Sequence, residues 1–245
     1  MSLIKIFPFF VVLVLPFFSF AQEESEGDKY NSELIGGINL NTNANIIGGI
    51  MASYARRINA KEFHYFGIEL VNVKHPKETR VVSNATGNLF VAYKRNHLIP
   101  LRLQYGRQFI LFHPAEEEGV QVAFNVCGGP TLGIVKPYMV EYDYFNYTLV
   151  EPFNPDKKRE ILGSAGIFSG FGLAKIVPGL NFKTSFSFKF SQFIGSVTGI
   201  EVGGLIEIYP KNIILLDVES TNPLKPQNNS AFTSVFINVF FGMRN

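Results

Sequence analysis

This chain has one cysteine, no tryptophan and few charged residues. Because Cys127 is alone, no disulfide can form within the chain, although soluble exported domains often use disulfides. Charged residues make up 17% of the 245 residues, below the ~25% of typical soluble domains. The formal net charge of +2 gives no excess of positive charge that would indicate a nucleic-acid partner. These shortages argue against both a soluble exported domain and a nucleic-acid-binding protein.

Beyond its first residues the sequence also lacks a long apolar run. No stretch after residue 21 approaches the length of a transmembrane helix, which needs about 18 or more largely uncharged apolar residues. An exported chain without a spanning helix is either soluble or a barrel, because only helices and closed barrels satisfy their backbone hydrogen bonds inside a bilayer.

Residues 1–21 have the three parts of a secretory signal peptide. Lys5 supplies a positive charge, 7–20 form a short apolar run, and Ser19 and Ala21 are the small residues before the expected cleavage point. A transmembrane anchor would need about 20 apolar residues, and this run is shorter and contains two prolines. We therefore expect cleavage after Ala21, a polar lead-in over 22–31 and one barrel domain over 32–245.

The clearest strand pattern lies at 180–193, where apolar and polar residues alternate. One face carries Leu180, Phe182, Thr184, Phe186, Phe188 and Phe190, and the other carries Asn181, Lys183, Ser185, Ser187 and Lys189. A period of two is typical of a β-strand. This strand is longer than the usual 5–6 residues or so and long enough to cross a bilayer, which takes about 9–11 tilted residues. It predicts a transmembrane strand with phenylalanines in lipid and lysines in a polar lumen.

Similar patterns between turn-type residues predict nine further strands, at 34–40, 46–57, 63–74, 88–94, 99–112, 120–127, 132–144, 197–209 and 231–241. The predicted fold class is all-β, a closed antiparallel transmembrane β-barrel of about ten strands, within a range of about eight to twelve. With the N-terminus in the periplasm, the outward connections are 41–44, 75–87, 113–119, 145–178 and 211–229. The other side carries short turns at 59–61, 95–98, 128–131 and 194–196, so nearly every long connection faces outward. We expect the connection at 145–178 to cover the extracellular mouth.

Four segments resemble a group of Bacteroidetes-type outer-membrane β-barrel proteins that is uncharacterised. They are 69–78 (ELVNVKHPKE), 98–108 (LIPLRLQYGRQ), 128–138 (GGPTLGIVKPY) and 175–183 (KIVPGLNFK). The resemblance implies a barrel in the bacterial outer membrane and supplies no activity.

Charged residues on the predicted inward faces have mixed signs, which predicts a salt-bridged lumen with little conduction. They are Glu69, Arg102, Glu141, Lys183, Lys189, Glu201 and Glu207. A three-residue hairpin loop at 194–196, with Gly195 free to adopt a positive φ, places Lys189 opposite Glu201 and Lys183 opposite Glu207. A slip of one residue would turn one strand inside out.

No motif indicates a reaction, a cofactor or a metal. The histidines, His64, His75, His97 and His113, are not spaced as a metal pair on one element. We expect a non-enzymatic structural or envelope-assembly component that is surrounded by outer-membrane lipid. Other envelope proteins are possible partners, and the sequence does not indicate an oligomeric state. Two alternatives stay open: an enzyme acting on lipid or peptide at the rim, pairing a histidine with Ser53, Ser185 or Ser187, and a small passive pore.

Overall fold

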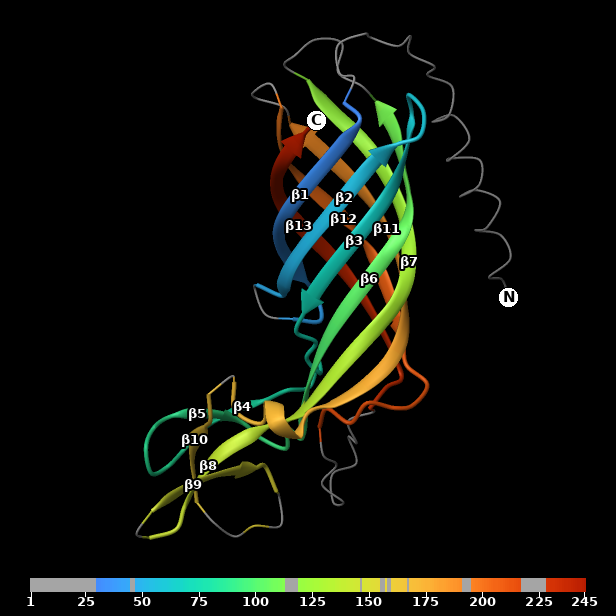
Figure 1. The fold of residues 1–245 in the computed structure, drawn as a ribbon. Helices are drawn as coiled ribbons and strands as arrows, with labels where there is room; N and C mark the ends of the chain where they lie inside the picture. Colours follow the sequence, from blue (N-terminus) through green and yellow to red (C-terminus); the bar gives the residue numbers. More distant parts are fainter. Residues whose placement is uncertain are drawn as a thin grey trace, which may run out of the picture.

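The computed structural model describes residues 30–44, 47–112, 119–145, 147–154, 157, 160–166, 168–190, 195–216 and 228–245, and the predicted signal peptide lies outside them. Eight antiparallel strands close a barrel in the order β1-β13-β12-β11-β7-β6-β3-β2 (Figure 1). They are β1 (Ser32–Asn41), β2 (Gly49–Arg57), β3 (Glu62–Val71), β6 (Asn96–Phe112), β7 (Val120–Pro137), β11 (Lys175–Phe190), β12 (Ser196–Ile208) and β13 (Ala231–Arg244). The first and last strands pair along most of their length, so the barrel has no open edge.

The barrel has eight strands and not about ten, for two reasons. The segment at 88–94 contributes β5 (Leu89–Val91), which pairs with β4 (Arg80–Val82) in a two-stranded sheet outside the barrel. The segments at 120–127 and 132–144 are not separated by a turn, because β7 runs through Gly128, Gly129 and Pro130.

A single side chain explains how β7 continues through Pro130. The pairing of β7 with β6 omits Gly129 and Pro130, whereas the pairing with β11 continues through both. Asn181 on β11 donates its side-chain amide to the carbonyls of Leu103, Gly129 and Pro130, at 3.3, 3.0 and 3.2 Å. The two N–H groups of this amide are shared among the carbonyls, which helps the barrel strand to accommodate a proline.

The three longest connections all lie at one end of the barrel. The long-connection end carries 42–48, 72–95, 138–174 and 209–230, and the short-connection end carries 58–61, 113–119 and 191–195. The connection at 113–119 changes ends relative to the prediction because the strand expected at 88–94 is not in the barrel. Both described termini lie at the short-connection end (Figure 1), where the amide of Asn31 donates to the carbonyl of Asn245 at 2.7 Å.

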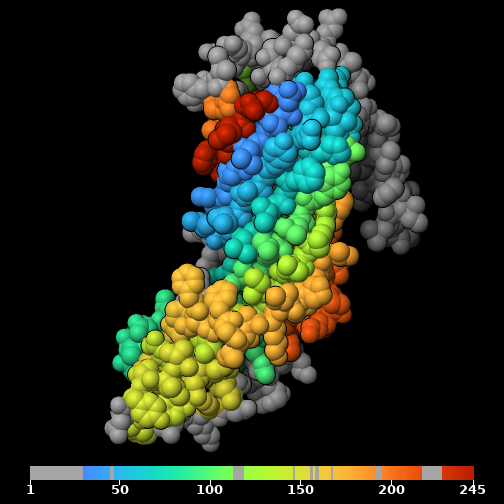
Figure 2. Space-filling view, in the orientation of Figure 1, coloured from blue at the N-terminus to red at the C-terminus, as the bar shows by residue number. Residues whose placement is uncertain are grey.

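The connection between β7 and β11 has structure of its own. It forms a three-stranded sheet of β8 (Met139–Asp143), β9 (Thr148–Pro152) and β10 (Ile161–Ser164), followed by a single 3₁₀ turn at Phe171–Leu173. This sheet projects from the long-connection end of the barrel, at the lower left of Figures 1 and 2. The mouth itself is filled by other segments, described below. No helix among the described residues has the length and apolar character needed to cross a membrane.

The register between β11 and β12 differs from the prediction by two residues. Phe188 lies opposite Ile200 and Lys189 opposite Gly199, so the predicted pairings of Lys189 with Glu201 and of Lys183 with Glu207 are wrong. The reason is that the hairpin is centred one residue earlier in the chain than the predicted loop, which moves every pairing partner by two residues. Gly195 does have a positive φ of 80°. A shift of two residues keeps every side chain on its predicted face, since the side-chain period is two.

Candidate functional site: the barrel interior

The polarity of the barrel is inverted relative to a soluble protein. On β11, Lys183 and Lys189 face inward and are 0% and 1% exposed, whereas Phe182 and Phe186 face outward and are 52% and 46% exposed. The same arrangement holds on the other barrel strands, where buried glutamates, asparagines and glutamines alternate with exposed aliphatic and aromatic residues. The interior is therefore the place where ionisable side chains are concentrated, and it is the candidate site.

Five of these charges form one continuous network, which we call the central network. Arg102 binds both Glu207 and Glu69, and Lys183 binds both Glu69 and Glu201. The Nζ atom of Lys183 lies 2.8 Å from Oε1 of Glu69 and 3.1 Å from Oε1 of Glu201. Because β3 and β12 are on opposite sides of the closed strand order, the network crosses the lumen.

Neutral groups complete the coordination of the central network. Glu201 accepts hydrogen bonds from Asn238, at 2.7 Å, and from the hydroxyl of Ser185. The hydroxyl of Tyr209 donates to Glu207, and the ammonium of Lys183 lies 4.7 Å from the ring centroid of Phe236. Buried charges are tolerated only when they are paired and their remaining hydrogen-bonding capacity is met. Both conditions are met here by groups from several strands.

A second cluster, the terminal network, lies toward the short-connection end. Glu33 binds Lys189 through one carboxylate oxygen and Arg244 through the other, with 2.8 Å between Oε2 and the Nε of Arg244. Arg244 also donates to Gln121 and lies 4.3 Å from the ring centroid of Tyr30. The ring of Tyr30 stacks on buried Phe63 at 5.0 Å, and together with Arg57 these rings form the end of the packed interior.

An apolar layer fills the lumen at the long-connection end. Its buried members include Leu98 and Val177, which face inward from β6 and β11, and Val73 from the connection after β3. Tyr209, Ile213 and Leu215 complete the layer from the segment that follows β12. The layer at the mouth thus comes from strand ends and from the connections that follow β3 and β12. Of the described residues in 145–178, Val177 on β11 belongs to the layer, and the prediction that this segment covers the mouth is not confirmed.

The structure brings together all but one of the charges predicted for the lumen. Glu69, Arg102, Lys183, Glu201 and Glu207 form the central network, and Lys189 belongs to the terminal network. Glu141 lies apart from them on β8, paired with Gly163 and Val150 in the three-stranded sheet. The apolar alternation at 132–144 continues across the end of β7 at Pro137, so the pattern did not show that the barrel strand had ended.

Sequence reasoning missed Glu33 and Arg244. Both lie just outside the predicted strands at 34–40 and 231–241, although each continues the inward-facing alternation of its strand. With them, the two networks contain four carboxylates (Glu33, Glu69, Glu201 and Glu207) and four cations (Arg102, Lys183, Lys189 and Arg244). The networks are therefore electrically balanced.

The described histidines and serines considered for catalysis lie in different parts of the barrel. His64 lies on the outer face, where its Nδ1 atom is 3.0 Å from the hydroxyl oxygen of Tyr105. Ser185 and Ser187 face the lumen and contact Asn125. His113 lies outside the described residues. Among the residues that the structure describes, no group of three or more histidine, cysteine or acidic side chains is arranged to hold a metal ion.

His97 lies at the long-connection end, beyond the apolar wall. Its ring contacts Tyr138 with 5.4 Å between centroids. Tyr138 directly precedes β8, so the ring of His97 packs at the base of the three-stranded sheet.

No family model matches the chain, and no curated protein matches it. Similar solved structures include Ail, the attachment invasion locus protein of Yersinia pestis, in complex with the heparin analogue sucrose octasulfate. The two chains superimpose with a TM-score of 0.43 at 9% sequence identity, and the match covers 89% of this chain and 100% of Ail. A second Ail structure has a TM-score of 0.40 at 8% identity, covering 89% and 100% of the two chains. Neisserial surface protein A has a TM-score of 0.37 at 7% identity, covering 88% of this chain and 97% of its own.

Proposed function

We propose that this chain is an integral outer-membrane β-barrel with a closed, non-conducting interior, which serves as a structural or envelope-assembly component. The observation that carries the proposal is the inverted polarity of the barrel. Charged residues are almost never fully buried in soluble proteins unless they are paired, and large contiguous apolar surfaces mark contact with a membrane or a partner. Here both features occur on the same strands.

Exposed apolar residues on the outer face of the barrel form its apolar wall. Its exposed members include Leu34, Ile38, Ile50, Phe66, Ile68, Leu70, Leu103, Phe182, Phe186, Ile200, Val202, Ile206, Ile237, Val239 and Phe241. The strands are long enough for the purpose, since β6, β7 and β11 contain 17, 18 and 16 residues and a tilted strand needs about 9–11 to cross a bilayer.

An aromatic cluster marks one boundary of this wall. Phe66 packs against Tyr105 and Tyr54, with 5.0 and 6.5 Å between ring centroids, and Tyr105 contacts His64. These residues lie on the outward face toward the short-connection end. Tyrosine and other aromatic residues with a polar tip are enriched where a membrane meets water. The cluster supports a membrane boundary near the short-connection end.

The choice of the bacterial outer membrane follows from three expectations taken together. They are export through a signal peptide cleaved after Ala21, long connections on the outer side, and the resemblance to Bacteroidetes-type barrel proteins. Outer-membrane lipid is the proposed surrounding of the wall. The proposal of other envelope proteins as partners is a hypothesis that identification of proteins cross-linked to the chain in native membranes would test.

The layered interior favours a closed barrel over a passive pore. From one end to the other, the lumen contains the stacked rings of Tyr30 and Phe63, the terminal network, the central network and the apolar layer around Leu98. Small barrels of about eight strands have interiors that side chains can fill. The lumen charges, Glu69, Arg102, Lys183, Lys189, Glu201 and Glu207, have a structural role in this proposal.

Refolding into lipid vesicles tests the membrane assignment. We expect the chain to float with phosphatidylcholine vesicles after a carbonate wash, to give β-rich circular dichroism and to migrate faster on a gel when unheated than when boiled. A folded, detergent-free monomer in aqueous buffer that does not bind vesicles would contradict the proposal.

A further inference from the structure

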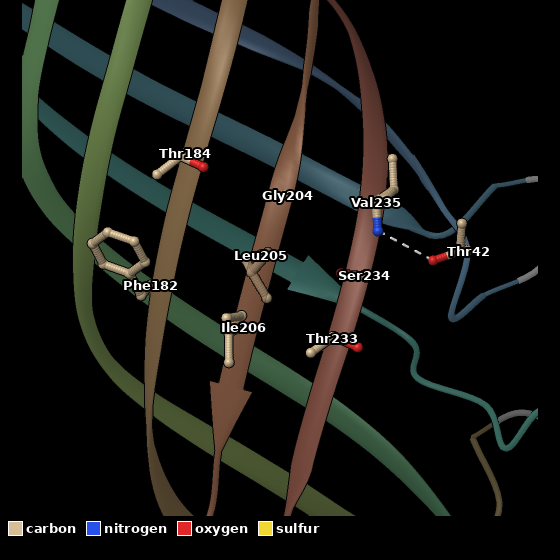
Figure 3. A pocket seen from close by; sticks show the side chains of 9 residues that line it. All are labelled: Thr42, Phe182, Thr184, Gly204, Leu205, Ile206, Thr233, Ser234 and Val235. Carbon is tan, nitrogen blue, oxygen red and sulfur yellow. Dashed lines mark hydrogen bonds between the residues drawn. The ribbon is translucent and has the colours of Figure 1, made fainter. Parts of the chain in front are cut away.

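Two cavities meet at Thr42, on the outer surface near the long-connection end. The first is a shallow groove of about 460 Å³ in the apolar wall, running across β11, β12 and β13 (Figure 3). Phe182 and Ile206 form its apolar sides, and Val235 and Thr42 lie at one end, where the amide of Val235 donates to the hydroxyl of Thr42. We call this cavity the wall groove.

The floor of the wall groove is low because a glycine lies in the middle of it. Gly204 occupies an outward-facing position on β12, between Val202 and Ile206. A Cβ atom at this position would meet its nearest neighbour, the carbonyl oxygen of Ser234, only at 4.0 Å. The space above Gly204 is therefore free of protein.

The second cavity, about 240 Å³ in volume, is polar and lies where the strands end. We call it the basic pocket; its lining is Thr42, Asn43, Ala44, Lys74, His75, Pro76, Glu78 and Arg80. The two connections that form it are joined by a hydrogen bond of 2.7 Å from the amide of Lys74 to the carbonyl of Asn43. Thr42 lines both cavities, so they are adjacent.

The basic pocket has an excess of positive charge. Its only acidic lining residue, Glu78, is bound by the buried ammonium of Lys94 at 2.7 Å. Among the described residues, no ion pair includes Lys74 or Arg80. Burial lowers the pKa of Lys74, and although Glu78 opposes this effect, the charges of Lys94 and Arg80 add to it. An anion bound between Lys74 and Arg80 would relieve this repulsion.

We propose that the wall groove and the basic pocket together bind one phosphate-bearing lipid, with its phosphate between Lys74 and Arg80 and one acyl chain along the wall groove past Gly204. The inference rests on the proposed membrane position, because the groove must face lipid. β1 ends at Asn41, so Thr42 marks the level at which the apolar wall gives way to polar connections. Lipid phosphates lie at that level, and guanidinium and ammonium groups suit them. A water-soluble phosphate would use the pocket and leave the apolar groove without a role.

The test uses the full folded chain in an uncharged detergent. One of three probes is added in increasing amounts: dioleoyl phosphatidylglycerol, dioleoyl phosphatidylcholine or inorganic phosphate. Native mass spectrometry counts the probe molecules that are bound at each concentration. We expect phosphatidylglycerol to bind about tenfold or more tightly than phosphatidylcholine, because two basic groups near a lipid phosphate act together. The double variant Lys74→Gln with Arg80→Gln should lose this preference. Gly204→Leu should weaken both lipids to a similar degree by filling the groove.

Matched controls separate the pocket from general charge effects. The double variant Arg56→Gln with Lys175→Gln removes one arginine and one lysine outside both cavities, and we expect it to keep the preference. Arg80 is exposed, so Arg80→Gln alone should fold and should lose part of the preference even if the double variant does not fold.

Three results would overturn the inference. They are an unchanged preference in the Arg80→Gln variant, an equal loss in the control variant, and phosphatidylglycerol binding that inorganic phosphate at equal concentration displaces completely. Flotation with vesicles is measured on the same preparations. A chain that inserts into vesicles without selecting phosphatidylglycerol contradicts only the lipid site, whereas a chain that does not insert contradicts the proposed function.

Discussion

Lys183 on β11 and Glu69 on β3 form an ion pair inside the barrel, with 2.8 Å between Nζ and Oε1. Their strands are not neighbours, since β7 and β6 lie between them in the closed strand order. Both side chains are buried, at 0% and 2% exposure. The pair therefore connects opposite parts of the wall through the lumen, which hydrogen bonds between adjacent strands do not do.

Replacing one partner of this pair should be costly, and replacing both should cost less than the sum. Lys183→Met leaves Glu69 and Glu201 without their shared cation, and we expect the free energy of unfolding to fall by about 3–5 kcal/mol. The second change, Glu69→Gln, should recover part of this loss in the double variant. Urea titration of the chain in lipid vesicles measures both effects. Thr184→Val on the outer face is the control, expected within about 0.5 kcal/mol of wild type; strictly additive losses would show that the two residues are not coupled.

Asn181 should be needed as a donor and not only as a polar group. Its amide donates to Thr131 at 2.9 Å as well as to the carbonyls of Gly129 and Pro130. Asn181→Asp keeps the shape but places carboxylate oxygens against carbonyl oxygens. We expect a loss of about 1–3 kcal/mol in the free energy of unfolding, measured by the same urea titration. An Asp variant as stable as wild type would mean that Pro130 is accommodated without these hydrogen bonds.

The register of the β11–β12 hairpin can be read by cross-linking. In a Cys127→Ser background, Phe188→Cys with Ile200→Cys places two cysteines directly opposite each other, so a disulfide should form on mild oxidation. Phe190→Cys with Ile200→Cys represents the alternative register and should cross-link much less. A gel shift after protease cleavage between the strands reports each product. Preferential cross-linking of the second pair would contradict the observed register.

The sequence pattern was most informative where the alternation of one strand was unbroken. The outward phenylalanines and inward lysines of β11 are placed as predicted, because an error in face would expose charge to lipid. The pattern could not determine which residue pairs with Lys189, because a shift of two residues along the partner strand leaves every side chain on the same face. In the structure, Lys189 forms its ion pair with Glu33 and not with Glu201. The number of strands was overestimated because Pro130 resembles a strand end until its compensation by Asn181 is seen. Glu141 was misplaced because β8 continues the apolar alternation outside the barrel.

The most direct test of the closed interior is the conductance of the purified, refolded chain in a planar phosphatidylcholine bilayer. Insertion is verified beforehand by the gel shift on heating. The packed rings, the two networks, whose charges balance when taken together, and the apolar layer predict no steady ion current at applied voltages of either sign. Reproducible, long-lived conductance steps from the wild-type chain would contradict the account, because they would require a continuous water path past Lys183 and Glu69.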